Sequence, residues 1–165
     1  MKDILTVIFL IFLTQQSYSQ SRPRDLGVPF GILPRGPLNS ITDVQGVQVG
    51  HFTKIEGSDI RTGVTAILPH RGNLFQEKVP AAVFVGNGFG KLAGVTQVQE
   101  LGTLESPIIL TNTLSVAAGI EGVVKYSLAQ QGNENVQSIN AVVGETNDGY
   151  LNDIRGMHIS SDEVL

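Results

Sequence analysis

Short apolar runs separated by glycine, proline or asparagine recur along the chain from about residue 41 onward. Their residues are largely β-branched, which is typical of β-strands. Most runs are continuous rather than alternating, so we expect both faces of these strands to be covered by other layers. The predicted strands span residues 47–53, 63–68, 81–85, 108–111 and 139–143.

Two segments show a helical spacing of apolar positions instead. The longer one, residues 116–131, repeats them at about the interval of helical turns. Ser115 is placed to be its N-cap, and Gly132 lies just past its expected end. A shorter helix is predicted near residues 96–101.

The last six residues have the pattern of a helix start. Ser160 and Glu163 have the spacing of a capping box, and Val164 and Leu165 begin an apolar face. The chain then stops after barely one turn, which is too short for a stable helix in water. We therefore interpret residue 165 as a truncation point. The alternative is a natural C-terminus that frays.

The N-terminus has the pattern of a secretory signal peptide. Lys2 is followed by an apolar run over residues 4–13, and small residues at Ser17 and Ser19 suit cleavage after residue 19. The run is about half the ~20 residues that a membrane-spanning helix needs, so we expect export to the periplasm or secretion and no stable membrane anchor. The alternative is a buried N-terminal helix. Residues 20–38, rich in proline, glycine and arginine, are predicted to form an extended lead-in to a domain over residues 39–165.

Composition excludes several kinds of site. The net charge is −4, only 16% of residues are charged and none cluster into a basic patch, so we expect no nucleic-acid partner. The absence of cysteine excludes disulfides, thiolate metal sites and a cysteine nucleophile. His51, His70 and His158 lack metal-ligand spacing and are interpreted as ordinary hydrogen-bonded histidines. We expect neither a metal nor a cofactor.

A glycine-rich segment follows the predicted strand at residues 81–85. Gly88, Gly90 and Ala93 have nearly the spacing of a dinucleotide-binding fingerprint, which would indicate an oxidoreductase. Such a unit needs an acidic residue at the end of the next strand, and that strand ends here at Asn112. A tight turn that uses glycines for positive φ explains the segment better.

The densest polar cluster, residues 144–153, comes directly after the predicted strand at 139–143. Functional groups in α/β sheets often lie just past the carboxyl ends of strands. Glu145 could bind a substrate ammonium group there, and Asn147 could donate a hydrogen bond to an oxyanion. An ordinary turn built from asparagine, aspartate and glycine remains the alternative.

Several short stretches, taken in order, resemble the L-aminopeptidase/D-esterase family, which includes the beta-peptidyl aminopeptidases. The resemblance covers about residues 27–165. Its stretches are PLNSITDV (37–44) with VQVGH (47–51), RTGVT (61–65), GNG (86–88) with KLAG (91–94), PIILTNTLS (107–115), and ETNDG (145–149) with LNDI (151–154).

The resemblance implies an α+β fold, a four-layer α/β/β/α sandwich similar to that of the N-terminal-nucleophile hydrolases, of which this chain would hold only part. It implies a precursor that cuts its own chain before a serine, downstream of residue 165, and a serine aminopeptidase or amidase acting on small peptides, amino-acid amides or esters. The partners would be the downstream subunit and further copies of the chain, because part of a sandwich exposes apolar strand faces.

The site residues implied by the resemblance are few. Glu145 matches an acidic position that lines the substrate pocket of the family, whereas Asn147 stands where related members place an oxyanion-site tyrosine. Thr111, Asn112 and Thr113 are candidates for the site wall, with a structural role as the first interpretation, and no catalytic residue is expected within this chain. The competing hypotheses are a non-catalytic binding or regulatory protein of the same fold and the nucleotide-binding oxidoreductase.

Overall fold

The computed structural model describes residues 21–165, so the signal peptide predicted for residues 1–19 lies outside the described residues. The chain divides into two compact units, Met1–Arg35 and Gly36–Leu165. In the first unit, residues 21–35 contain turns and bends but no helix or strand, and Arg35 pairs with Asp25 at 2.8 Å. None of the helices formed by residues 21–165 has the length and apolar character needed to cross a membrane.

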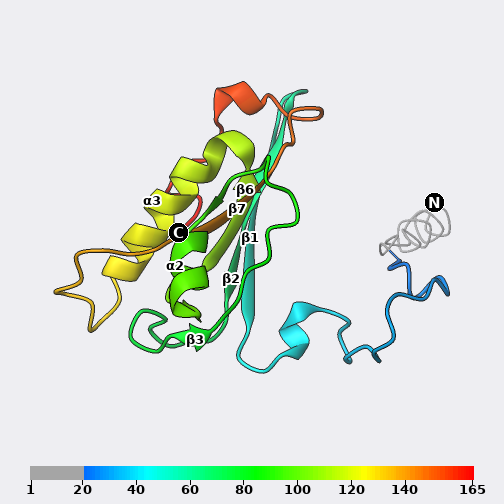
Figure 1. Cartoon of the computed structure of the whole chain (residues 1–165). Coiled ribbons are helices and arrows are strands. Elements are labelled where there is room, and N and C mark those ends of the chain that lie inside the picture. Colours follow the sequence, from blue (N-terminus) through cyan, green and yellow to red (C-terminus); the bar gives the residue numbers. More distant parts are fainter. Residues whose placement is uncertain (1–20) are drawn as a thin grey trace, which may run out of the picture. The chain divides into compact units, whose positions relative to one another are not determined.

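A five-stranded mixed sheet is the centre of the second unit (Figure 1), with the strand order β1-β2-β6-β7-β4. β6 and β7 are parallel, and all other neighbours in this sheet are antiparallel. A separate two-stranded ribbon pairs β3 with β5. The strands are β1 (Gln48–Glu56), β2 (Ile60–Leu68), β3 (Val79–Pro80), β4 (Leu92–Ala93), β5 (Thr103–Leu104), β6 (Ile108–Asn112) and β7 (Val142–Thr146).

The helix α3 (Val116–Leu128) connects the parallel strands β6 and β7 and packs on the sheet beside them. Its Gly119 lies so close to the sheet that a Cβ there would come within 2.8 Å of Val143 Cγ1. Glycine therefore sets the distance between helix and sheet. The other helical elements are α2 (Val95–Leu101) and the 3-10 turns η1 (Ile41–Asp43), η2 (Thr113–Ser115) and η3 (Ile154–Gly156).

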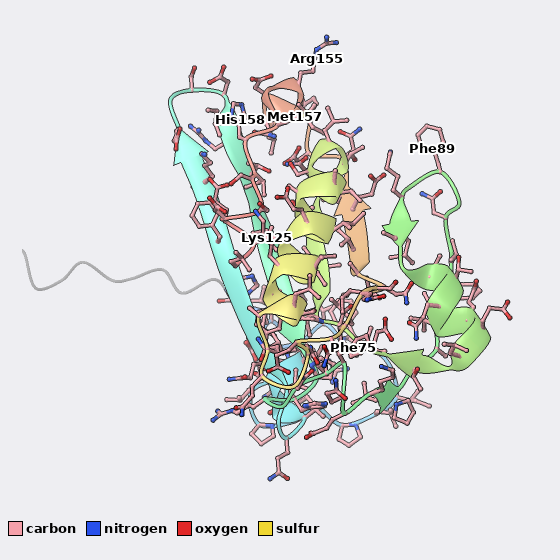
Figure 2. The ribbon with its side chains drawn as sticks, turned by 90° about the vertical axis from the view of Figure 1, so that its left-hand side faces the viewer. Phe75, Phe89, Lys125, Arg155, Met157 and His158 are labelled. Carbon is pink, nitrogen blue, oxygen red and sulfur yellow. The ribbon has the colours of Figure 1, made fainter. Side chains whose placement is uncertain are left out.

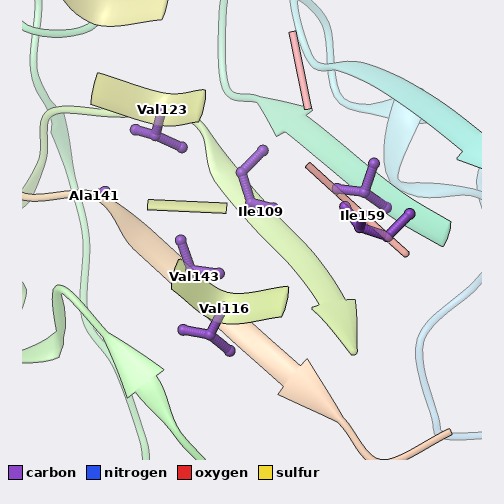
Figure 3. Close-up of a cluster of buried hydrophobic side chains, with 7 residues drawn as sticks. Ile109, Val116, Val123, Ala141, Val143 and Ile159 are labelled. Carbon is purple, nitrogen blue, oxygen red and sulfur yellow. The ribbon is translucent and has the colours of Figure 1, made fainter. Parts of the chain in front are cut away.

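The main hydrophobic core lies between α3 and the sheet (Figure 3). It joins side chains from the three strands β2, β6 and β7, from the helix and from the C-terminal segment, and Val143 in its centre is fully buried. Such burial fixes β6 and β7 firmly, and with them the polar residues at their carboxyl ends. The buried members are Val64, Ile109, Val116, Val123, Ala141, Val143 and Ile159.

The sheet face that points away from α3 carries exposed apolar side chains. Leu110 alternates with the buried Ile109 along β6 and is 45% exposed, and Ile55 of β1 is 65% exposed. Part of this face is covered, because Val98 of α2 and Leu104 of β5 pack against Val142 in a second, smaller core. The unit is thus an α+β structure with α3 on one face of its sheet and a partly covered apolar surface on the other.

Most of the predicted strands are confirmed, with two exceptions. The hairpin β1–β2 and strand β6 contain the predicted residues 47–53, 63–68 and 108–111 almost completely. The strand predicted at 139–143 starts later, at Val142, and runs on to Thr146 because β6 pairs with it along this length. The strand predicted at 81–85 is wrong, since the adjacent ribbon partner β5 is only two residues long and offers these residues no ladder.

Both predicted helices exist, but the longer one ends earlier than residue 131. It ends at Leu128, where the Nδ2 amide of the buried Asn133 donates to the carbonyl of Ser127 at 2.6 Å. Gly132 therefore lies in the following turn. Ser115 does precede the helix, but its hydroxyl makes no capping bond.

The helix start predicted at residues 160–165 is a turn in the structure. The Glu163 carboxylate accepts hydrogen bonds from the Ser160 N–H at 2.6 Å and from its hydroxyl at 2.5 Å, so the acidic half of the capping box forms without a helix. These bonds, hydroxyl first, lower the pKa of Glu163 to about 2. Lys54 Nζ, 3.1 Å from Glu163, ties the segment to β1.

Candidate functional site

A cleft of about 450 Å³ opens where β6 and β7 end. It combines the end of the central sheet with the start of β2 and the loop after β7. Its lining residues are Arg61, Thr62, Gly63, Thr65, Leu110, Thr111, Asn112, Glu145, Thr146 and Asp148.

The parallel register of β6 and β7 explains why polar groups gather here. Thr111 is paired with Glu145, and Asn112 with Thr146, so two polar segments 34 residues apart in sequence meet at the same sheet edge. The carboxyl ends of parallel strands are a common location for binding sites. Thr111 is fixed there by a hydrogen bond of 3.1 Å from its hydroxyl to the Gly63 carbonyl.

Glu145 is the most unusual group in the cleft. Its side chain is only 8% exposed, and its Oε2 makes no hydrogen bond to any described residue. The Nζ of Lys91 lies 3.5 Å from that oxygen. A buried carboxylate is costly unless charge and hydrogen bonds compensate it, so Glu145 is suited to accept hydrogen bonds from a cationic ligand.

Asn112 holds the cleft wall together. Its side chain is buried, and its Oδ1 accepts two backbone N–H groups of η2, from Leu114 and Ser115, at 3.1 Å each. Its Nδ2 donates to Thr62 Oγ1 at 2.8 Å, and the Thr62 hydroxyl donates to Asp148. The side chain of Asn112 thus joins β6 to η2 and to β2, and reaches the loop after β7 through Thr62.

Two of the predicted site residues lie outside the cleft lining. Asn147 is exposed, and its Oδ1 accepts the N–H of Gly149 at 2.9 Å, which is an ordinary asparagine turn. Thr113 lies in η2, and its buried Oγ1 has no hydrogen-bond partner among residues 21–165. The structure therefore brings Thr111, Asn112 and Glu145 together but not Thr113 or Asn147, and the oxyanion role of Asn147 stays a prediction.

Sequence reasoning missed several members of the site. Arg61 and Thr62 come from the start of β2, and Asp148 lies inside the cluster after β7 without having been singled out. Arg61 is held by hairpin carbonyls, with Nη1 2.6 Å from the oxygen of Ile60. The signal that could have found these residues is the β1–β2 hairpin, whose turn places the start of β2 at the same sheet edge.

The dinucleotide interpretation fails on its geometry. It requires a strand before the glycines, and residues 81–85 form none. The positive φ expected at Gly88 and Gly90 is also wrong; it occurs at Gly94, with φ of 78°, where a Cβ would lie 2.5 Å from the Ala141 carbonyl oxygen. Close backbone approach, not phosphate binding, explains that glycine.

All three histidines make hydrogen bonds within the described residues, and His70 makes two because its Nδ1 also accepts the N–H of Gly72. His51 contacts the Thr65 hydroxyl, His70 the Glu77 carbonyl, and His158 the Asp153 carboxylate. The part of the chain that the structure describes contains no cluster of histidine and acidic residues able to hold a metal ion.

Comparison with known proteins adds a family and a fold. Residues 39–165 match the family described as Peptidase family S58. The chain is 40% identical over 152 residues to the beta-peptidyl aminopeptidase BapA of Sphingosinicella microcystinivorans, a match that covers 87% of this chain and 37% of that protein. The chain thus spans well under half the length of this curated relative.

Two solved structures share the fold over 87% of this chain. One is the PH0078 protein of Pyrococcus horikoshii OT3, with 48% identity, a TM-score of 0.82 and 44% of that chain covered. The other is an L-aminopeptidase D-Ala-esterase/amidase of Ochrobactrum anthropi, with 35% identity, a TM-score of 0.75 and 42% covered. The latter is described as a prototype of the serine aminopeptidases and a variant of the Ntn hydrolase fold. The expected α+β fold, similar to N-terminal-nucleophile hydrolases, is confirmed.

Proposed function

This chain belongs to peptidase family S58, and on that premise we propose that it is the N-terminal part of an exported aminopeptidase or amidase. The whole protein would hydrolyse small peptides, amino-acid amides or esters that carry a free amino group. The attacking serine would arise by self-cleavage at a position downstream of residue 165.

The observation that carries this proposal is the buried carboxylate of Glu145 at the end of β7. An acidic side chain that is 8% exposed and has an oxygen without a hydrogen bond offers a strong, oriented site for an ammonium group. A free amino terminus is the group that separates substrates of an aminopeptidase from internal peptide bonds. Glu145 would therefore position the scissile bond by holding the substrate at its amine.

The nucleophile would come from outside the described residues. Two hydroxyls in the cleft wall are already committed: that of Thr111 donates to the carbonyl of Gly63, and that of Thr62 donates to Asp148. A serine hydroxyl needs a nearby base, and a serine exposed by chain cleavage carries one in its own α-amine. The name of the Ochrobactrum protein, a serine aminopeptidase of Ntn type, supports this assignment.

The partners follow from the part of the sheet face that stays uncovered. Leu110 and Ile55 expose apolar surface on the side away from α3. In a four-layer sandwich this face would pack against a second sheet, which the downstream subunit would supply. We further propose that the mature protein is a homo-oligomer, that export depends on cleavage after residue 19, and that the cleft uses no metal or cofactor.

The proposal is tested with the full-length precursor on a denaturing gel. The expected result is two bands, together with hydrolysis of an amino-acid amide, and replacement of the downstream serine by alanine should leave one uncut band without activity. A precursor that stays whole yet hydrolyses the amide would overturn the self-cleavage mechanism. A precursor that is whole and inactive would favour the non-catalytic binding protein instead.

A further inference from the structure

Lys91 and Glu145 face each other across the outer edge of the sheet. The antiparallel register of β4 and β7 pairs Leu92 with Gly144. One residue further along this register, Lys91 lies opposite Glu145. The lysine Nζ lies 3.5 Å from the carboxylate Oε2. The two partners differ sharply in their surroundings, since the lysine side chain is 57% exposed and the glutamate side chain 8%.

An ordinary cross-strand ion pair does not account for this arrangement. Such pairs are exposed at both ends and stabilise a sheet only modestly. Here the anion is buried, and its Oε2 receives no hydrogen bond from a described residue despite the nearby ammonium. The contact between the two groups is therefore electrostatic and loose, and the lysine is the partner that is free to move into solvent.

The other charged residues of the cleft are already engaged. The Arg61 guanidinium donates to hairpin carbonyls, including that of Gly57 at 3.0 Å. Asp148 accepts hydrogen bonds from the hydroxyl of Thr62 at 2.7 Å and from the amide of Asn152 at 3.1 Å. Among the residues that the structure describes, Lys91 is thus the cation that balances Glu145.

We propose that Lys91 is an internal substitute for the ammonium group of the substrate. In the empty cleft it compensates the charge of Glu145, and it turns toward solvent when a free amine binds. One positive charge replaces another, so the buried carboxylate is never left uncompensated, a state that would be strongly unfavourable. This inference rests on the proposed amine-binding role of Glu145 and makes Lys91 a positioning residue that lowers the affinity for amines.

The loop that leads into β4 allows this exchange. Phe89, two residues before Lys91, lies at its tip (Figure 2) and is 96% exposed. Gly90, between them, lies beside the carboxylate, and a Cβ there would be 3.5 Å from Glu145 Oε1. No bulky side chain at position 90 therefore blocks the path between Lys91, Glu145 and the solvent.

The test uses two small probes on the full-length protein, n-butylammonium and neutral n-butanol, with dissociation constants measured by ligand-observed NMR titration. Lys91→Met should tighten n-butylammonium binding roughly three- to tenfold, because the competing charge is gone, and should leave n-butanol binding unchanged. Lys91→Arg keeps the charge and should bind both probes like the wild type.

The outcomes distinguish a failure of the proposed Lys91 exchange from a failure of the proposed amine binding at Glu145. If Lys91→Met leaves n-butylammonium binding unchanged, weakens it, or alters both probes equally, Lys91 is not a competitor. Glu145→Gln serves as the second variant and should abolish the preference for n-butylammonium over n-butanol. If that preference persists, the amine site itself is wrong; if it is lost while Lys91→Met shows no gain, only the exchange is wrong. Thermal unfolding of each variant checks that the fold is intact.

Discussion

The hydroxyl of Thr62 donates a hydrogen bond of 2.7 Å to Asp148 Oδ2, across 86 positions of sequence. Thr62 stands at the start of β2, whereas Asp148 lies in the loop that follows Glu145 and β7. Because Asn112 donates to the same hydroxyl oxygen at 2.8 Å, one threonine joins three separate segments of the cleft wall. This side chain therefore helps to position the loop behind the candidate amine site, together with the Arg61 N–H, which donates to Asn152 Oδ1 at 3.1 Å.

Replacing that threonine should weaken the fold measurably. Thr62→Val keeps the shape but leaves the amide of Asn112 and one oxygen of Asp148 without their partner. We expect the free energy of unfolding to fall by about 1–3 kcal/mol in denaturant titrations. Thr53→Val, at an exposed position of the neighbouring strand β1, is the matched control and should change it by less than about 0.5 kcal/mol. Equal stability of the two variants would show that the network contributes little.

The charge of Glu145 should matter only for substrates with a free amine. In the full-length enzyme, Glu145→Gln should lower kcat/KM for an amino-acid amide by roughly 30-fold or more, since truncating a buried charge pair costs about 2–5 kcal/mol. An N-acetylated counterpart should lose much less. Glu56→Gln, with a side chain that is 60% exposed, is the control and should behave like the wild type. A similar loss for both substrates would remove Glu145 from the substrate pocket.

The close contact between α3 and the sheet can be tested with one methyl group. Gly119→Ala improves helix propensity by up to about 1 kcal/mol, but its Cβ would lie 2.8 Å from Val143 Cγ1. Because Val143 is fully buried and cannot move aside, overpacking should prevail, and we expect a net loss of about 1–2 kcal/mol in unfolding free energy. At Gly88 a Cβ meets nothing within 4 Å, so Gly88→Ala should be nearly neutral. A Gly119→Ala variant more stable than the wild type would contradict the packing argument.

The hydrogen bonds between Ser160 and Glu163 should make the free energy of unfolding depend on pH in the acidic range. Hydrogen bonds from Ser160 lower the pKa of Glu163 from 4.5 to about 2. A lowered folded-state pKa stabilises the protein above the unfolded value, and this contribution is lost as the pH falls from about 5 to 2. Unfolding free energies measured across this range should decline less steeply in Glu163→Gln, with Ser160→Ala intermediate. Identical slopes in all three proteins would mean that the contact does not persist in solution.

The sequence predicts the strands well where a partner strand of matching length exists. The strand at residues 108–111 is found as expected from its continuous apolar run, and the helix over residues 116–128 from its apolar periodicity. Residues 81–85 have the same apolar character but no neighbouring ladder, and pairing cannot be known from one segment alone. For the same reason Thr146 and Glu145, which are polar, were not predicted to belong to β7.

In the candidate site, too, some features can be predicted from local sequence and others depend on strand pairing. The location of Glu145 after a buried strand follows from local sequence, and Thr111 and Asn112 meet it because parallel strands end together. The opposition of Lys91 and Glu145 depends on the register of β4, which is only two residues long and carries almost no periodic signal. Asn147 differs in that its turn-forming chemistry is visible in the sequence and is found in the structure, whereas its oxyanion role stays a prediction.

The shortness of β4 also bears on how such a cleft can diversify. With only Leu92 and Ala93 in the ladder, the segment that carries Lys91 contributes little to global stability. Insertions or deletions there would disturb the scaffold little, while Glu145 stays held at the end of β7, which is paired with β6 along its whole length. Natural variants could therefore adjust the strength of ligand capture at one margin of the protein and leave the capturing group itself untouched.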